Sequence, residues 1–121
     1  MEFIKKETIK ELSNPGVVSR QILNNENSNS TRVTITEVHL EPGAVQKRHT
    51  HPTSEQIWYA TKGAGQLLLA DDETMDFSAG DAVRFADGDV HGLFNNSDAE
   101  FVYISVTSPP INFNYAYKNK G

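Results

Sequence analysis

The chain contains no cysteine. This absence excludes disulfide bonds, thiolate metal sites and cysteine nucleophiles. Long hydrophobic runs are missing as well: no stretch approaches the roughly 20 apolar residues that a membrane span requires. The first residues, MEFIKKETIK, also lack the apolar run of a signal peptide. We therefore expect a cytoplasmic protein that does not interact with a membrane.

Basic residues are in the minority: 11 lysines and arginines stand against 16 aspartates and glutamates, which gives a formal net charge of -5. Nucleic-acid binding through phosphates needs a basic surface, so this class of partner is disfavoured. The 121 residues fit one domain. A hydrophobic fraction of 37% is ordinary for a globular chain with one core.

From residue 32 onward the pattern predicts an all-β protein. Short segments rich in valine, isoleucine, threonine and aromatic residues are separated by turns rich in glycine, aspartate and asparagine. Strands at this spacing are typical of a sandwich or a barrel. We divide the single domain, residues 1–121, into an N-terminal arm or strand over 1–31, a barrel over 32–107 and a tail over 108–121. The tail is expected to lie along the barrel or across a partner subunit.

Two of the four histidines, His49 and His51, occur in the stretch RHTHPTSEQ. Side chains at i and i+2 of a strand point to the same side. The pair can therefore present two imidazoles to one cation, as a site for Zn, Ni, Fe, Mn or Cu requires. A His-x-His pair alone is unspecific, and two hydrated histidines flanking Pro52 would be the simpler interpretation.

A longer sequence pattern favours the metal-binding interpretation over that of two surface histidines. In GAVQKRHTHPTSEQIWYATKG, a glycine stands five residues before the His-x-His pair and another closes the segment. In GDAVRFADGDVHGLFNN, Gly88 is followed after two residues by His91 and after three more by Asn95. Both stretches resemble the two signature motifs of the cupin superfamily, although Ala86 stands where the family usually has a proline. The resemblance implies a jelly-roll barrel, or double-stranded β-helix, of six to eight strands.

The resemblance also implies that His91 joins His49 and His51 around one divalent metal ion, Zn, Ni, Fe or Mn, in the open mouth of the barrel. The fourth ligand stays open between two residues. Gln56 leaves the six residues before the closing glycine that the family motif has, and strand register favours it. Glu55 fits a shorter form of the motif, and a carboxylate is the better ligand for a hard cation.

Trp58, the only tryptophan, shares strand parity with Gln56. If Gln56 faces the metal, Trp58 lines the pocket, where its face could stack on a ligand ring; tryptophans are more often core or interface residues. His39 lies outside both motifs and is expected to have a structural or surface role. Asn95 matches the motif and is expected to fix a turn through side-chain bonds to the backbone.

These features indicate a metal-binding cupin that acts on a small oxygenated carboxylate or sugar acid, because a dipositive centre in a low-dielectric cup attracts anionic, chelating ligands. The ligand set resembles that of small cupins that open the ring of unsaturated uronates. One alternative is a dioxygenase or decarboxylase resembling quercetinase-like and oxalate-decarboxylase-like cupins, which usually carry the glutamate. The other is a cupin that binds a small ligand without turnover. The sequence identifies no general acid or base.

Basic side chains near the motifs, Lys47, Arg48 and Arg84, could assist an anionic ligand, although a solvated position is expected for each. The resemblance further implies a homodimer, because small single-barrel cupins often pair through the outer sheet or an exchanged N-terminal strand. Residues 1–23 could supply that strand. A dimer would also cover the strand edges that a short barrel exposes.

Overall fold

The computed structural model describes residues 1–120, and these residues form ten antiparallel strands. The strands are β1 (Glu11–Asn14), β2 (Val17–Leu23), β3 (Thr34–Leu40), β4 (Val45–His49), β5 (Glu55–Lys62), β6 (Ala64–Leu68), β7 (Thr74–Ser78), β8 (Ala82–Phe85), β9 (His91–Phe94) and β10 (Phe101–Ser108). Three short 3-10 helices are also present, η1 (Lys6–Thr8), η2 (Ala70–Asp72) and η3 (Phe113–Ala116). None of the helices described is long and apolar enough to cross a membrane.

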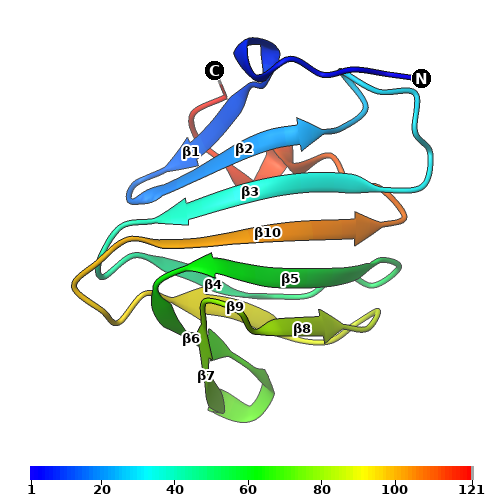
Figure 1. The fold of residues 1–121 in the computed structure, drawn as a ribbon. Helices are drawn as coiled ribbons and strands as arrows, with labels where there is room; N and C mark the ends of the chain where they lie inside the picture. Colours follow the sequence, from blue (N-terminus) through cyan, green and yellow to red (C-terminus); the bar gives the residue numbers. More distant parts are fainter. Residues whose placement is uncertain (121) are drawn as a thin grey trace.

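The strands form two sheets that lie one behind the other (Figure 1). The six-stranded sheet has the order β1-β2-β3-β10-β5-β8, and the four-stranded sheet has the order β4-β9-β6-β7. This crossing connectivity is that of the double-stranded β-helix, so the predicted fold class is confirmed. There are more strands than the six to eight expected, because β1 and β2 of the N-terminal arm extend the large sheet, where β2 pairs with β3.

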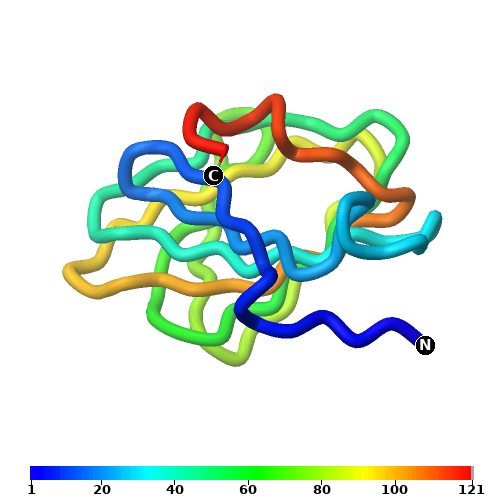
Figure 2. The backbone as a smooth tube through the Cα atoms, turned by 90° about the horizontal axis from the view of Figure 1, so that it is seen from above, coloured from blue at the N-terminus to red at the C-terminus, as the bar shows by residue number. Residues whose placement is uncertain are grey.

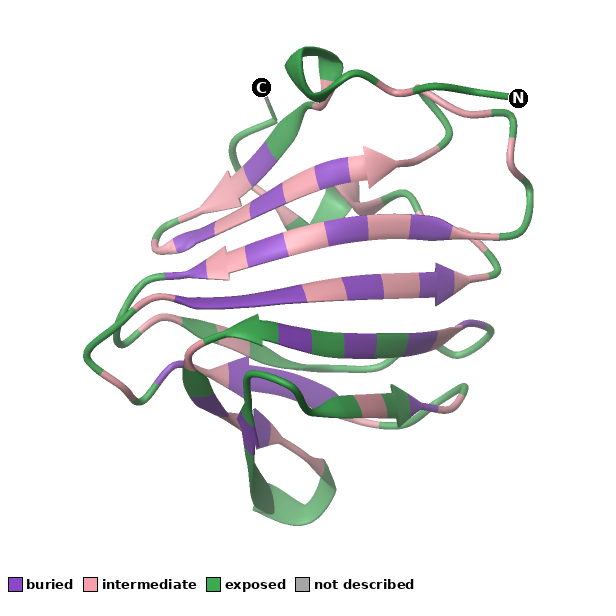
Figure 3. Ribbon diagram, in the orientation of Figure 1, coloured by how far each residue is buried: buried purple, intermediate pink, exposed green. Residues whose placement is uncertain are grey.

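Burial alternates along the central strands of the large sheet, because successive side chains point to opposite faces (Figure 3). The inward-facing side chains differ between the two ends of the sheet. At one end Leu40 of β3 lies opposite Phe101 of β10, and both are fully buried in the apolar core. At the other end Thr34 lies opposite Thr107, and both are buried as well. The barrel therefore has an apolar end and a polar end.

Asn95 fixes the turn between β9 and β10, as the sequence predicted. Its side chain is fully buried, and its amide donates hydrogen bonds to the carbonyl oxygens of Leu40 and Ala99 at 3.1 and 2.8 Å. Its side-chain oxygen accepts a bond from the Ser97 amide at 3.1 Å. A single asparagine thus ties the end of β3 to the loop that leads into β10.

The C-terminal segment, residues 109–120, turns back after β10 and ends beside β1 (Figure 2). Asn119 and Ser13 exchange two backbone hydrogen bonds, of 2.8 and 3.0 Å. The side chain of Asn14 donates to the Ala116 carbonyl and accepts from the Lys118 amide, each at 2.9 Å. The segment therefore lies along the barrel of its own chain, held by β1.

Candidate metal centre

Three histidines from two distant stretches of the chain converge at the polar end of the barrel. His49 ends β4 and His91 begins β9, and the two residues are directly opposite each other, with ring centroids 4.3 Å apart. His51 follows β4 by two residues, and its ring centroid lies 5.0 Å from each of the other two. One nitrogen of each ring lies within 4.8 Å of the others.

Backbone carbonyls orient two of these rings. Nδ1 of His49 donates to the Lys47 carbonyl at 2.7 Å, and Nδ1 of His91 donates to the Asp89 carbonyl at 3.0 Å. A neutral imidazole that donates from Nδ1 carries its lone pair on Nε2. Histidines that ligate metals are commonly oriented in this way by a bond from the other ring nitrogen. His51 is anchored through its main chain, since its carbonyl accepts a bond from the Gly88 amide at 2.9 Å.

Two of the three ligand nitrogens are buried without a partner. His51 is 5% and His91 2% exposed, and Nε2 of each has no hydrogen-bond partner among the described residues. Burial lowers the pKa of each ring from 6.5 to about 4, so both are neutral at pH 7. A buried polar atom without a partner costs about 1–3 kcal/mol. A cation would satisfy both atoms, so these residues fit a metal ion; His49 is exposed and leaves the site open to solvent.

A close approach between backbones sets two of the histidines opposite each other. A Cβ atom on Gly92 would lie 2.6 Å from the Gln46 carbonyl oxygen and 3.0 Å from the Arg48 amide nitrogen. The pairing of β4 with β9 shifts register between Gln46 and His49, at the same level. Only glycine fits at position 92, and sequence reasoning did not single this residue out, because the glycine falls at no fixed position of the motif.

The two candidates for the fourth ligand point in opposite directions. Gln56 is 4% exposed and lines the cavity next to the histidines, whereas Glu55 lies on the outer face of the sheet and pairs with Arg84 at 2.7 Å. The Gln56 amide donates to Thr107 Oγ1 at 2.9 Å, and its Oε1 accepts from the Trp58 indole at 3.1 Å. Because the indole can only donate, this bond fixes the orientation of the amide. Oε1 keeps a second lone pair for a cation.

Trp58 combines both roles weighed for it, because it belongs to the core and also lines the cavity. It is 2% exposed, and other rings surround it: Tyr103 at 4.3 Å, Phe85 at 5.0 Å and His91 at 5.5 Å between centroids. These neighbours leave no free indole face for a ligand ring to stack on. Trp58 instead supports the site, by holding the Gln56 side chain.

A cavity of about 620 Å³ lies in front of the histidines, within the size range of small-molecule sites. Among the described residues, no aspartate or glutamate lines this cavity, although the chain as a whole is acidic. Three basic residues, Lys47, Arg48 and Lys118, line it. Phe113 of the C-terminal segment covers part of it, with its ring 6.0 Å from that of His51. The cavity is therefore suited to an anionic ligand.

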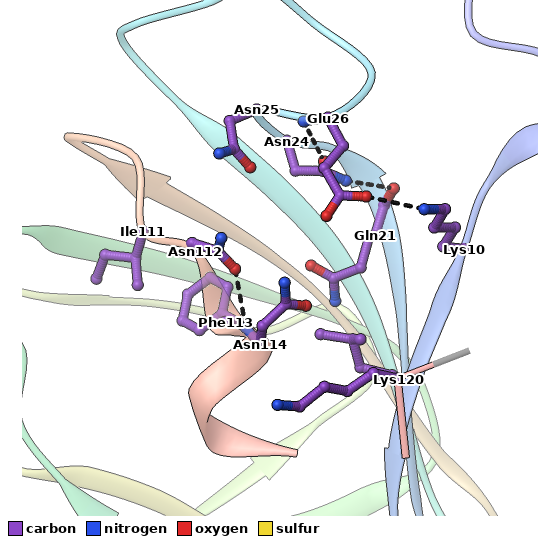
Figure 4. A pocket seen from close by; sticks show the side chains of 11 residues that line it. Lys10, Gln21, Asn24, Asn25, Glu26, Ile111, Asn112, Phe113, Asn114 and Lys120 are labelled. Carbon is purple, nitrogen blue, oxygen red and sulfur yellow. Dashed lines mark hydrogen bonds and ion pairs between the residues drawn. The ribbon is translucent and has the colours of Figure 1, made fainter. Parts of the chain in front are cut away.

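A second, much smaller cavity of about 80 Å³ lies between the C-terminal segment and the loop after β2 (Figure 4). Lys10 and Glu26 form an ion pair of 3.0 Å beside it. The Asn112 side chain accepts from the Asn114 amide at 3.0 Å and caps η3, which places Phe113 between the two cavities. A water molecule takes up about 30 Å³ in the liquid, so this space suits water rather than a substrate.

The remaining candidates lie away from the histidines. His39 is on the outer face of the large sheet, where Nε2 lies 2.8 Å from Glu37 Oε1, in agreement with the structural or surface role expected. Arg84 is exposed and binds Glu55 rather than the cavity. Arg48 is exposed too, and its Nε donates to the Leu69 carbonyl at 2.7 Å.

This fold, with a histidine cluster inside one end of the barrel, defines a cupin. The family model for the cupin domain (Cupin_2) matches residues 36–107, so the chain belongs to this family. Among curated proteins, the chain is similar to a probable oxalate decarboxylase of Arthroderma benhamiae, with 36% identity over 76 residues. That match covers 57% of this chain but only 18% of the relative.

Two solved structures share the fold over most of the chain. KdgF from Halomonas sp. has a TM-score of 0.77 at 24% identity, and the match covers 93% of this chain and 96% of that one. The polyketide cyclase RemF from Streptomyces resistomycificus has a TM-score of 0.77 at 19% identity, covering 89% of this chain and 79% of that one. At these identities the likeness concerns the fold, and the function must be argued from the site.

Proposed function

We propose that the protein binds one divalent metal ion through His49, His51, His91 and Gln56, and that it acts on a small oxygenated carboxylate or sugar acid. The observation that carries the proposal is the pair of buried, unpartnered Nε2 atoms of His51 and His91 beside His49. Three neutral imidazoles and an amide oxygen would form a set without negative charge. A dication held by them keeps its full charge and attracts an anionic ligand.

The metal, when bound, would supply Lewis acidity to a carboxylate, hydroxyl or carbonyl oxygen. The chain's own residues would do the rest. Lys47 and Lys118 draw an anion toward the cavity that they line. No carboxylate lines that cavity within the described chain, so none is available there as a general acid or base. Phe113 covers the cavity beside His51.

The second candidate function is decarboxylation or oxygen chemistry, and the similarity to oxalate decarboxylases favours it. The position of Glu55 argues against it. The glutamate that cupins of this type usually carry as a ligand would have to be Glu55, and this side chain is bound to Arg84 on the outer face. Simple binding of a small ligand without turnover is the third possibility, and it uses the same cavity.

Two measurements test the proposal. The first is the metal content of protein purified without chelators, for the wild type and for His91→Ala; we expect about one equivalent in the wild type and its loss in the variant. Titration with Ni²⁺ should also quench the fluorescence of Trp58, whose ring lies 5.5 Å from that of His91. If the wild type is purified without metal and Ni²⁺ does not quench its fluorescence, the proposed metal site is contradicted.

The second measurement follows turnover by the metal-loaded protein. Incubation with unsaturated uronates should reduce their enol-ether absorbance, and no change would remove the uronate reaction. Carbon dioxide released from oxalate, or oxygen consumed with a flavonol, would support the second candidate instead. Saturable binding without turnover of any of these substrates would support the ligand-binding protein.

A further inference from the structure

We propose that the wall of the cavity formed by β3 and β10 is a hydroxyl-binding subsite, with Ser105 and Thr36 as its hydroxyl groups. The subsite would select a polyhydroxylated carboxylate, such as a sugar acid, over a plain dicarboxylate. This inference rests on the proposed function, because the metal would hold the carboxylate end of the same ligand.

The first observation is an inversion of polarity along β10. Tyr103, Ser105 and Thr107 face inward and are buried, whereas Ile104 and Val106 face outward and are only partly buried. On β3, Thr36 is likewise buried while the adjacent Ile35 is not. A sheet that only builds a core places its aliphatic side chains inward. Hydroxyl groups in their place indicate that this part of the interior binds something polar.

The second observation is that Ser105 and Thr36 lie side by side next to the histidine site. Ser105 is the direct cross-strand partner of Thr36 on one side and of Trp58 on the other. The neighbouring Thr107 is the partner of Gln56 and accepts a hydrogen bond from its amide. The hydroxyl row therefore continues directly into the residues that support the proposed metal ligand.

The third observation is an unpartnered hydroxyl. Ser105 is 4% exposed, lines the cavity, and its Oγ has no hydrogen-bond partner within the described chain. Buried polar groups normally have partners, and a hydroxyl can both donate and accept. A ligand hydroxyl in the cavity would satisfy it.

A pair of phenols extends the same wall. The hydroxyl of Tyr103 donates to Gln46 Oε1 at 2.6 Å, and the phenol of Tyr117 on the C-terminal segment lies close to both Gln46 and Ser19. Burial raises the pKa of both tyrosines, so both phenols stay protonated at neutral pH. They can therefore share hydrogen bonds with ligand hydroxyls without adding charge. The basic residue Lys118 also lines the cavity, next to Tyr117.

The test compares two ligands that share carboxylates and differ in hydroxyls. Galacturonate and oxalate are titrated by calorimetry into Zn²⁺-loaded protein, for the wild type, Ser105→Ala and Ser108→Ala. Ser108 is the matched control, because it lies on the same strand and does not line the cavity. We expect Ser105→Ala to weaken galacturonate binding roughly 3- to 10-fold, the loss of one hydrogen bond, and to leave oxalate binding and zinc content unchanged. Ser108→Ala should behave as the wild type, and Tyr103→Phe should repeat the selective loss.

The outcomes separate the subsite from the metal site. If oxalate binds and galacturonate does not, the subsite is wrong and the metal site stands. If Ser105→Ala weakens both ligands equally, the hydroxyl does not recognise the sugar, and the subsite is again wrong. If neither ligand binds to protein that holds a full equivalent of zinc, the proposed function fails together with the subsite.

Discussion

Glu55 and Arg84 form an ion pair of 2.7 Å on the outer face of the large sheet, from neighbouring strands β5 and β8. The pair shows which way the strand faces. Because side chains alternate along β5, the outward position of Glu55 places Gln56 inside the barrel. The candidate metal centre therefore has an amide and not a carboxylate beside its three histidines.

Metal content should distinguish the two residues. We expect Gln56→Ala to lower the affinity for the metal at least about tenfold, as loss of a supporting group at a metal site does. Glu55→Ala should retain full metal and lose less than about 1 kcal/mol of stability, because the pair with Arg84 is largely exposed. Metal analysis and urea unfolding of both variants measure this. Loss of metal from Glu55→Ala alone would mean that Glu55, and not Gln56, faces the interior of the barrel.

Acid should destabilise the metal-free protein in a window set by two histidines. The pKa of His51 and of His91 is about 4 in the folded chain and 6.5 ordinarily, so the unfolded chain binds more protons between these values. The contribution of the two neutral histidines to the free energy of unfolding is complete above pH 6.5, and it is lost as the pH falls toward 4. The urea midpoint of protein treated with a chelator should fall from pH 7 to pH 5.

The control for this prediction removes the titrating rings. A double variant, His51→Asn with His91→Asn, should show a urea midpoint that changes less between pH 7 and pH 5 than that of the wild type. The pKa of the Glu37 carboxylate is lowered from 4.5, so this group takes up its proton below pH 4.5 and does not change the urea midpoint between pH 7 and pH 5. An unchanged slope in the double variant would contradict the assignment.

Removing the buried Asn95 side chain should destabilise the fold strongly. Asn95→Ala leaves the Leu40 and Ala99 carbonyls without their donor, and we expect a loss of about 2–4 kcal/mol in the free energy of unfolding. Urea denaturation measures it. The adjacent Asn96 is exposed, so Asn96→Ala should change stability by less than about 0.5 kcal/mol. Equal effects from the two variants would show that the turn does not depend on the buried amide.

Homodimer formation stays a prediction, and the outer face of the large sheet is where we expect it. Ile57 and Tyr59 of β5 are 42% and 49% exposed there, beside the partly buried Ile104 and Val106 of β10. Light scattering after gel filtration should give the mass of a dimer for the wild type and a monomer for Ile57→Lys combined with Tyr59→Lys. A monomeric wild type would contradict the prediction; the variant's retained metal would show that it is folded.

The metal motif could be predicted from the sequence because its spacing carries the geometry. The His-x-His pair and His91 fall at positions that the barrel brings together, and strand parity places Gln56 and Trp58 on the same face. The choice between Glu55 and Gln56 stayed open because parity could not be followed through the turn at Pro52. In the structure Glu55 pairs with Arg84 and Gln56 lines the cavity, which supports Gln56; its role as a metal ligand stays a prediction.

Other parts of the site gave no usable signal. In TITEVHL hydrophobicity alone would place Ile35 inside and Thr36 outside, yet Thr36 has the strand parity of the buried Val38 and is 5% exposed, whereas Ile35 is not buried. Propensity rules cannot tell a polar cavity wall from a solvent-facing one. The positions of Phe113 and Tyr117 at the cavity could not be predicted either. The tail carries no motif, and its place depends on hydrogen bonds to β1.

The attachment of the tail to β1 has a practical consequence for handling the protein. An affinity tag or fusion partner added at the carboxyl end would be attached close to the segment that carries Phe113 and Tyr117 along the cavity. Met1 is exposed, and the first residues of the chain do not line this cavity. Tags for assays of metal uptake or turnover therefore belong at the amino end.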